Sequence, residues 1–478
     1  MRRHEQVADA GVVDRSTVRR HASARHPTLS DSRLLLAGIL LLAVVIRFVD
    51  IGSPLGSDDG YSYIVGAAPT VHAFLERLAG SENTPPLFYL LLEPLPIGRP
   101  IWLLLPAVLP GAVLCALLYL AVRRPLGERV ALLAALAVAV APLLVTYSDA
   151  ARAFMLGDVA LLIALGAILR LDEKASPRWW LVYVLAGIVS VYSEYDSAIF
   201  LLALTASALW LGRGDRRRMA VLGPAPILAL IPWIPQLLRA QDALNRTKVA
   251  PASPPPSLPA LRDVVVTLAL GEYGGTTNLV LRWLEVAVFA AVAAAVIMVL
   301  RRQAARAGGR AGRAILLSAS TGVLDLLGHA IAGAAGINVF DSRYLTILIP
   351  LTAVLAAAAV VATGRRAILV LGAALLVALG AIGIVKRYHR DFQPDLTPVR
   401  NLAEALHART VLTNSSVVVY YLRSLGPALD RPFNLGQGRG RTCARPCLII
   451  DDRRIPGPPR PVTDSHTAIG PFLLTLER

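Results

Sequence analysis

Long apolar segments dominate this chain, and short polar segments separate them. An α-helix needs about 17–25 mostly apolar residues to cross a bilayer, and eleven segments approach that length. These segments are residues 34–49, 101–122, 128–146, 153–171, 178–195, 197–212, 219–237, 279–300, 314–335, 343–363 and 366–385. The pattern predicts an all-α polytopic membrane protein, in which the short Pro-rich segment 85–97 lies at the membrane interface.

The number of Lys and Arg residues alternates between high and low in successive predicted loops, and this alternation tests the predicted membrane topology. With the N-terminus in the cytoplasm, the inside segments hold 24 of the 48 Lys and Arg residues, and the outside loops hold 8. Cytoplasmic loops of membrane proteins carry such an excess of basic residues. The odd number of spans then places residues 386–478 outside. We therefore expect a multi-pass plasma-membrane protein with a cytoplasmic N-terminus and an extracytoplasmic C-terminal domain.

The composition agrees with a membrane protein and changes how the basic charge is interpreted. Of the 478 residues, 55% are hydrophobic and only 17% are charged, whereas soluble proteins average about 25% charged residues. This balance excludes a disordered chain and disfavours an ordinary soluble enzyme. The net charge of +16 raises the question of nucleic acid, but no basic run is interleaved with aromatic residues. The charge therefore marks topology, and no nucleic-acid partner is expected.

Composition divides the chain into three parts. Residues 1–32 are charged and lack apolar periodicity, which predicts a disordered cytoplasmic tail. Residues 33–385 form the transmembrane part. In residues 386–478, alternation over 409–421 and the apolar run 448–450 predict strands of a small extracytoplasmic α/β domain.

Two cysteines lie in this external domain. Cys443 and Cys447 are close enough in sequence for a local disulfide, which an extracytoplasmic location permits. Zinc is the weaker alternative, because no second cysteine pair or histidine cluster lies nearby.

Polar residues gather in the loops predicted to face outside. The first external loop, residues 52–100, carries Asp58 and Asp59 between glycines. The other external polar residues follow later spans or precede them: Asp149, Arg152, Glu194, Asp196, Arg246, Lys248, Arg343 and Tyr344. If the topology holds, all of them meet at one membrane face and form a shared polar cavity.

These side chains are of the types that bind a phosphate group and activate a hydroxyl group. Arginine and lysine bind phosphate groups, and a nearby carboxylate can act as a base on a hydroxyl. Adjacent carboxylates such as Asp58 and Asp59 can also hold a divalent metal ion, such as Mg²⁺ or Mn²⁺. A lipid-phosphate donor with a hydroxyl acceptor fits these features. The plain alternative for the pair is a capped turn, since Asp favours helix N-caps.

Four motifs in order then point to a family. They are Asp58-Asp59-Gly60-Tyr61, the Pro-Pro segment 85–92, the basic turn 123–129 with the residues that follow it to Phe154, and Arg343-Tyr344 before Pro350. Over residues 34–385 the chain resembles the GT-C glycosyltransferases that use polyprenyl-phosphate-linked sugars. Within them it resembles the family-39-like group related to protein mannosyltransferases and lipid A aminoarabinose transferases.

The resemblance implies a GT-C-like fold and an inverting transfer of a sugar from a polyprenyl phosphate to a hydroxyl of a glycan, lipid or protein. It implies a loop aspartate as the base, which we assign to Asp58, with Asp59 orienting it or helping to hold a metal. Arg343 and Arg152 are the expected phosphate contacts, and Lys248 and Arg246 are their alternates.

The remaining candidates would hold the sugar, the lipid or the acceptor. They are Tyr61, Tyr89, Tyr344, Glu194 and Asp149. For the arginines the alternative is snorkelling to the interface, and for the tyrosines it is an aromatic belt. The loop 238–278 contains a Pro/Ala/Ser stretch and sits where a lid over the donor could lie.

Two alternatives stay open, one for the identity of the sugar and one for the class of protein. The chain departs from the family at Asp59, where Glu is common, and at Thr84, where His is common. The pentapeptide 57–61 is also similar to that of actinobacterial arabinosyltransferases, which implies a cell-wall arabinofuranosyltransferase that uses decaprenyl-phosphate arabinose. A transporter or flippase of lipid-linked sugars is the other alternative, although no internal repeat is found and the charges lie at one face.

Overall fold

A computed structural model describes most of the chain. It covers residues 29–271 except 50, 52–54, 82–83, 174–175, 213–214 and 240–255, and residues 309–388 except 338. Beyond these it describes a few isolated positions and the strands in residues 410–413, 447–452, 466–469 and 472–477. Residues 1–28 of the predicted tail and most of the predicted lid loop 238–278 therefore lie outside the described residues, whereas residues 29–32, predicted as part of the disordered tail, begin the first helix.

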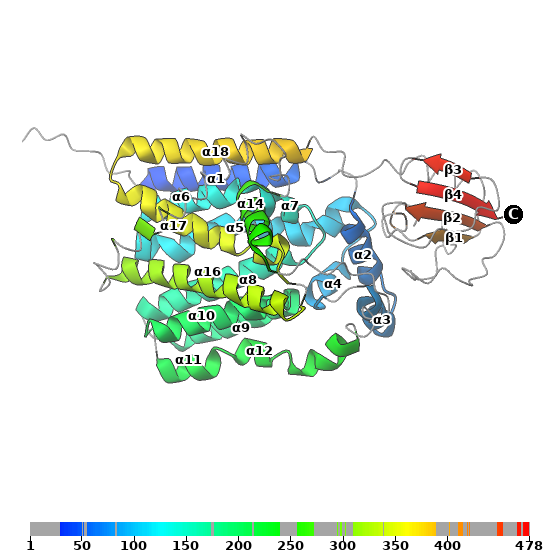
Figure 1. Cartoon of the computed structure of the whole chain (residues 1–478), viewed down its shortest axis with the longest axis horizontal. Helices are drawn as coiled ribbons and strands as arrows, with labels where there is room; N and C mark the ends of the chain where they lie inside the picture. The colour runs from blue at the N-terminus through cyan, green and yellow to red at the C-terminus, as the bar shows by residue number, and fades with distance from the viewer. Residues whose placement is uncertain are drawn as a thin grey trace, which may run out of the picture.

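Helices lying side by side form the main body of the molecule (Figure 1). They are α1 (Leu29–Phe48), α5 (Pro100–Leu126), α6 (Glu128–Ala139), α8 (Phe154–Glu173), α9 (Pro177–Ser193), α10 (Ser197–Trp210), α16 (Arg310–Ala334), α17 (Leu348–Ala362) and α18 (Arg366–Tyr388). Helix α8 packs against α5 and α9, and α6 packs against α17. Buried alanines such as Ala135 and Ala357 line these contacts, because small side chains let helices approach closely.

Shorter elements complete the helical body. They are α7 (Pro142–Ser148), α11 (Arg216–Leu222), α12 (Ala225–Leu228), the 3₁₀ turn η2 (Ile231–Trp233), α14 (Leu258–Leu270) and the 3₁₀ turn η3 (Ser342–Leu345). The predicted span 219–237 consists of several short helical pieces, which together form one candidate span, Arg216–Arg239. Pro224, Pro226 and Pro232 lie at the breaks between these pieces, since proline lacks the N–H that a helix interior needs.

Several helices have the length and composition of membrane spans. Among the described residues, five helices are long and apolar enough to cross a membrane: Pro100–Leu126, Phe154–Leu171, Arg216–Arg239, Arg310–Ala334 and Arg366–Val385. The bent pair α6–α7 brings the number to six, and α10 and α17 are shorter apolar helices. The chain is therefore a helical protein with several candidate spans, whereas the full set of eleven stays a prediction. The predicted span 279–300 lies almost entirely outside the described residues.

The predicted span 128–146 is not one straight helix. It bends by 58° between α6 and α7, because Pro142 cannot continue the hydrogen-bond ladder of α6. Arg47, fully buried in α1, stabilises the bend from the side. Its Nη1 donates to the Ala139 carbonyl at 3.1 Å, and its Nε donates to Ser148 Oγ at 2.9 Å. The bend determines where the chain leaves α7 and so where Arg152 lies.

Three short helices lie together at one end of the bundle (Figure 1). They are α2 (Ser57–Gly66), α3 (Val71–Ser81) and α4 (Leu87–Leu92). A second apolar core joins them to α5, with Leu55, Val65 and Phe88 buried against residues such as Leu103. This core packs the first loop against α5 at the end of the bundle. Helix α4 lies within the segment predicted to lie at the interface.

The C-terminal part contains a four-stranded sheet. Its strands are β1 (Thr410–Thr413), β2 (Cys447–Asp452), β3 (His466–Ile469) and β4 (Phe472–Glu477), in the order β1-β2-β4-β3. β1 and β2 are parallel, and the other pairs are antiparallel. The strand predicted in 409–421 is confirmed at β1, residues 410–413, whereas positions 418 and 420 are helical, and the predicted run 448–450 lies within β2. The α/β character of the domain stays a prediction, and so does the disulfide, because Cys443 lies outside the described residues.

Candidate functional site

The predicted acidic pair opens helix α2. Asp58 and Asp59 lie in its first turn, where the partial positive charge of a helix N-terminus favours carboxylates. Asp59 Oδ2 accepts a hydrogen bond from the Gly56 backbone N–H at 2.6 Å. The capping role considered as an alternative therefore applies to Asp59.

Asp59 also ties α2 to the turn between α7 and α8. Its Oδ1 accepts from the Ala151 N–H at 2.6 Å, and Ser62 Oγ donates to the Ala151 carbonyl at 2.5 Å. Burial raises the pKa of Asp59 to about 6, although the two backbone N–H groups oppose this rise. With both oxygens engaged and the side chain buried, Asp59 positions α2.

Asp58 has a different environment although it is the adjacent residue. Its side chain is 50% exposed, and its Oδ1 lies 3.1 Å from Nη2 of Arg152. The Arg152 charge holds the pKa of Asp58 below its ordinary value, and Arg343 contributes in the same direction. Asp58 is thus an ionised, accessible carboxylate beside a cation.

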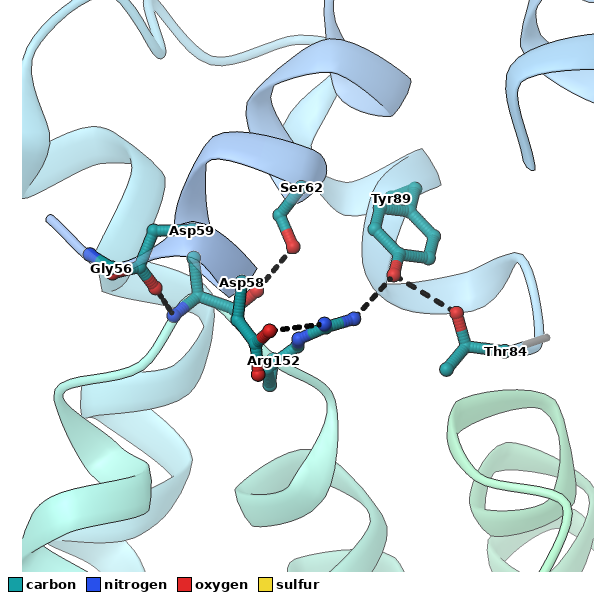
Figure 2. Close-up of polar contacts among 8 residues, drawn as sticks. Gly56, Asp58, Asp59, Ser62, Thr84, Tyr89 and Arg152 are labelled. Carbon is teal, nitrogen blue, oxygen red and sulfur yellow. Dashed lines mark hydrogen bonds and ion pairs between the residues drawn. The ribbon is translucent and has the colours of Figure 1, made fainter. Parts of the chain in front are cut away.

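Arg152 joins this carboxylate to a tyrosine. Figure 2 shows its guanidinium between Asp58 and Tyr89, whose hydroxyl accepts from Arg152 Nη1 at 3.3 Å. The Tyr89 hydroxyl also lies 2.9 Å from Thr84 Oγ1. Arg152 and Tyr89 are both buried, so neither interfacial snorkelling nor an aromatic belt describes them. The predicted phosphate ligand and the predicted groove tyrosine form one network.

Arg343 and Tyr344 lie in η3, between α16 and α17. Arg343 Nη2 is 3.1 Å from Asp341 Oδ2, and burial raises the pKa of the Tyr344 hydroxyl. The Tyr344 ring packs against Phe154, whose ring in turn contacts Tyr147.

The structure separates the other predicted site residues. Glu194 is buried at the end of α9, beside Tyr344 in a small pocket. Asp149 closes α7, and Tyr61 is partly buried in α2. Arg246 and Lys248 lie outside the described residues.

Three residues of that pocket were not predicted from the sequence. Asp158 of α8 and Asp325 and His329 of α16 line it together with Glu194 and Tyr344. An ionisable side chain inside an apolar span is a functional signal in its own right, and all three residues carry it. Their convergence could not be read from the sequence, because α8 and α16 are far apart along the chain.

The acidic pair does not fit the predicted metal site. Both oxygens of Asp59 accept backbone hydrogen bonds, and Asp58 faces Arg152. A divalent ion needs several oxygen ligands that converge on one point. Across the part of the chain that the structure describes, no group of three or more His, Cys, Asp or Glu residues is arranged to hold a metal.

Comparison with known proteins gives a family match over part of the chain and the fold of its helical body. Residues 97–238 match the family described as dolichyl-phosphate-mannose-protein mannosyltransferase. No curated protein matches the chain. A solved structure of ArnT from Cupriavidus metallidurans bound to undecaprenyl phosphate matches with a TM-score of 0.51 and 14% identity, covering 88% of this chain and 93% of that one. This chain has the GT-C fold.

Two archaeal structures extend the comparison of this GT-C protein. The oligosaccharyltransferase AglB from Archaeoglobus fulgidus, in complex with an inhibitory peptide and a dolichol-phosphate, matches with a TM-score of 0.52 and 14% identity over 79% of this chain. An oligosaccharyltransferase structure from the same organism with Zn and sulfate matches with a TM-score of 0.51 and 17% identity over 78% of this chain. The GT-C protein spans 58% and 55% of those two chains.

Proposed function

We propose that this GT-C protein is an integral-membrane glycosyltransferase that moves a sugar from a polyprenyl-phosphate donor to a hydroxyl of a glycan, lipid or protein. The observation that carries the proposal is the Asp58–Arg152 pair, in which an accessible carboxylate faces a buried guanidinium at 3.1 Å. The match to a mannosyltransferase family over residues 97–238 and the GT-C fold support it.

The donor phosphate binds Arg152 and Arg343 in this proposal, with Arg246 or Lys248 as further contacts. Arginine suits the role because its planar fork pairs with phosphate oxygens. The incoming phosphate competes with Asp58 for Arg152. Losing part of that interaction raises the pKa of Asp58 towards its ordinary value and makes the carboxylate a stronger base.

The reaction is then a single displacement with inversion. Asp58 accepts the proton of the acceptor hydroxyl while the acceptor oxygen forms a bond to the anomeric carbon. The bond between that carbon and the phosphate oxygen breaks, and the polyprenyl phosphate leaves with the extra negative charge. Arg152 and Arg343 stabilise this charge. Asp59 holds α2, and so Asp58, in position through its bonds to Gly56 and Ala151.

The remaining predicted residues bind substrate in the same scheme. Tyr344 and Glu194 contact the sugar, and Tyr61 and Asp149 contact the acceptor, whereas Tyr89 orients Arg152. The active site faces outside the plasma membrane, with the N-terminus in the cytoplasm and the C-terminal domain outside. The sidedness of the basic residues in the sequence supports this orientation.

Reconstitution distinguishes a transferase from a lipid transporter. The protein is placed in liposomes that contain bacterial membrane extract as the source of acceptors. Radiolabelled polyprenyl-phosphate mannose and decaprenyl-phosphate arabinose are supplied in parallel, which also identifies the sugar. We expect the label to leave the lipid and appear in an acceptor. Label that crosses the bilayer while still attached to its lipid would support a transporter and contradict the proposal.

A further inference from the structure

A small pocket lies between α8, α16 and the corner that joins α9 to α10. We call it the acidic pocket, because its wall includes Asp158, Glu194, Asp196, Ser197, Asp325 and His329. Aromatic and aliphatic side chains form the rest of the wall. The free space inside is about that of one water molecule. A sugar ring or a phosphate group therefore does not fit into it.

Carboxyl oxygens in this wall are buried and lack hydrogen bonds. Asp325 is fully buried, and neither of its carboxyl oxygens forms a hydrogen bond among the described residues. Asp158 is 5% exposed, and its Oδ2 also forms no hydrogen bond within the part of the chain that the structure describes. Buried polar atoms are normally paired with protein groups or with ordered water. Three oxygens that line one pocket therefore indicate a small hydrogen-bonding ligand between α8 and α16.

The imidazole of His329 contacts these groups but does not satisfy them. Its Nδ1 lies 3.0 Å from the backbone oxygen of Asp325 and 3.4 Å from Oδ1 of the same residue, so the ion pair leaves the carboxyl group without a hydrogen bond. Its Nε2 lies 3.8 Å from Asp196 Oδ2, which is longer than a hydrogen bond. Polar groups at such a separation are commonly bridged by water. His329 Nε2 therefore adds a fourth polar atom for the same ligand.

Water matches this wall better than a metal ion. Across the residues that the structure describes, no group of three or more His, Cys, Asp or Glu residues is arranged to hold a metal. Water both donates and accepts hydrogen bonds, so it can pair with a carboxyl group in either protonation state and with an imidazole in either tautomer. An internal water needs two to four polar partners and about the space of one molecule, and the acidic pocket provides both.

We propose that the acidic pocket is an internal hydration site, in which one water molecule bridges Asp158 of α8 to Asp325 and His329 of α16. The bridge links two helices that both pack against α5 and α10. Water-mediated hydrogen bonds are nearly as favourable as direct ones, so the bridge stabilises the contact between these helices. The inference does not depend on the proposed function, because it concerns the packing of the helical body.

A methyl group placed in the pocket tests the hydration site. Gly157 of α8 lines the pocket, and a Cβ added there would lie 3.6 Å from Glu194 Cγ and 3.7 Å from Ser197 Oγ. These are ordinary contact distances, so the methyl group fits without a clash but takes space that the water needs. Gly166 is the matched control on the same helix, where an added Cβ would lie 3.5 Å from Ala121 Cβ, away from the pocket.

Thermal unfolding of the full chain in detergent compares the two variants. We expect Gly166→Ala to raise the unfolding midpoint by roughly 1–2 °C, because alanine favours a helix. Gly157→Ala should instead lower it by roughly 2–6 °C, because the buried carboxyl groups lose their water. A rise of the same size in both variants would overturn the hydration site.

Two further measurements identify the ligand itself. An experimental density map that resolves ordered water should show one peak within about 3.2 Å of Asp158 Oδ2 and of an Asp325 carboxyl oxygen. Such a map without this peak would overturn the proposal. The unfolding midpoint of the wild type should be the same in NaCl, KCl and choline chloride at equal ionic strength. A rise specific to Na⁺ or K⁺ would assign the pocket to a cation and would also overturn the proposal.

Discussion

The Asp58 carboxylate and the Arg152 guanidinium face each other at 3.1 Å, the first half-exposed and the second buried. The pair joins α2 to the turn before α8, and Arg152 continues to the Tyr89 hydroxyl. An acid that remains ionised and a cation that is preorganised thus share one contact. In the proposed function, the donor phosphate competes with Asp58 for this guanidinium.

Replacing Arg152 by Gln should weaken binding of the donor phosphate and raise the Asp58 pKa. A hydrogen bond to a charged group contributes about 1.5–3 kcal/mol, so we expect roughly 10- to 150-fold weaker binding of polyprenyl phosphate. Arg218→Gln is the matched control, because Arg218 is paired with Asp215 on the surface at α11. Binding is measured by displacement of labelled polyprenyl phosphate. Equal affinity in the two variants would contradict the phosphate role.

Asp59 makes stability fall as the pH rises through a defined window. Its pKa is about 6 in the folded protein against an ordinary value of 3.8, so the folded state binds more protons between these values. The contribution of Asp59 to stability is therefore greatest below pH 4, falls between pH 4 and about 6, and is constant above that range. The contribution is about 3 kcal/mol. The difference between wild type and Asp59→Asn in pH-dependent thermal unfolding should show this slope, and a difference constant over pH 4–7 would argue against it.

Gly111 is required where α5 passes Ser148. A Cβ at this position would lie 2.0 Å from Ser148 Oγ and 3.2 Å from Arg47 Nε. We expect Gly111→Ala to destabilise the protein by about 1–3 kcal/mol, through overpacking. Ser148→Ala in the same chain should restore part of that loss, because it removes the nearest atom.

Gly38 provides the control for this substitution. It lies in α1, and a Cβ added there would meet nothing within 4 Å, so Gly38→Ala should be neutral or should stabilise the helix by about 0.5–1 kcal/mol. Thermal unfolding in detergent measures all four proteins. Equal stability of the two alanine variants would show that the contact between α5 and α7 is looser than described.

Tyr420 connects the C-terminal part to the first loop. Its hydroxyl donates to the Gly98 carbonyl at 3.0 Å, and its ring meets that of Tyr63 in α2 edge to face. Tyr420→Phe keeps the ring contact and removes the hydrogen bond, at a cost of about 0.5–1.5 kcal/mol. Hydrogen exchange of α2 should then be faster by roughly 2- to 12-fold if opening of α2 depends on this contact. Unchanged exchange in α2 would mean that it does not.

The sequence is sufficient to predict the helical class and to predict that Asp58 and Arg152 lie in loops at the same face, but not that they form a pair. Apolar segments of span length specify helices, and the alternation of basic loops places both residues at one face. The different environments of Asp58 and Asp59 cannot be predicted from the sequence. They arise because one step along a helix turns the side chain from solvent towards the Ala151 backbone. The bend at Pro142 can be predicted from the sequence, because proline interrupts a helix. The hydrogen bond from Arg47 that stabilises the bend cannot, because it depends on the packing of α1 against α6.

The acidic pocket depends on tertiary packing in the same way. Asp158, Asp325 and His329 are visible in the sequence as ionisable residues inside apolar segments. Averaging hydropathy over a span conceals them, and no spacing rule links α8 to α16. Both helices pack against α5 and α10, and this packing brings the three side chains to one cavity.

In the proposed reaction Asp58 is the base and Asp59 is not. Single-turnover transfer from a labelled polyprenyl-phosphate sugar tests it most directly, in wild type, Asp58→Asn, Asp59→Asn and Asp215→Asn. Asp215 is the control because it is also an aspartate paired with an arginine and is similarly exposed, at 49% against 50% for Asp58. We predict a loss of about 10²- to 10⁴-fold for Asp58→Asn, a smaller loss per folded molecule for Asp59→Asn, and none for Asp215→Asn. Transfer at the wild-type rate by Asp58→Asn would contradict the assignment of Asp58 as the base.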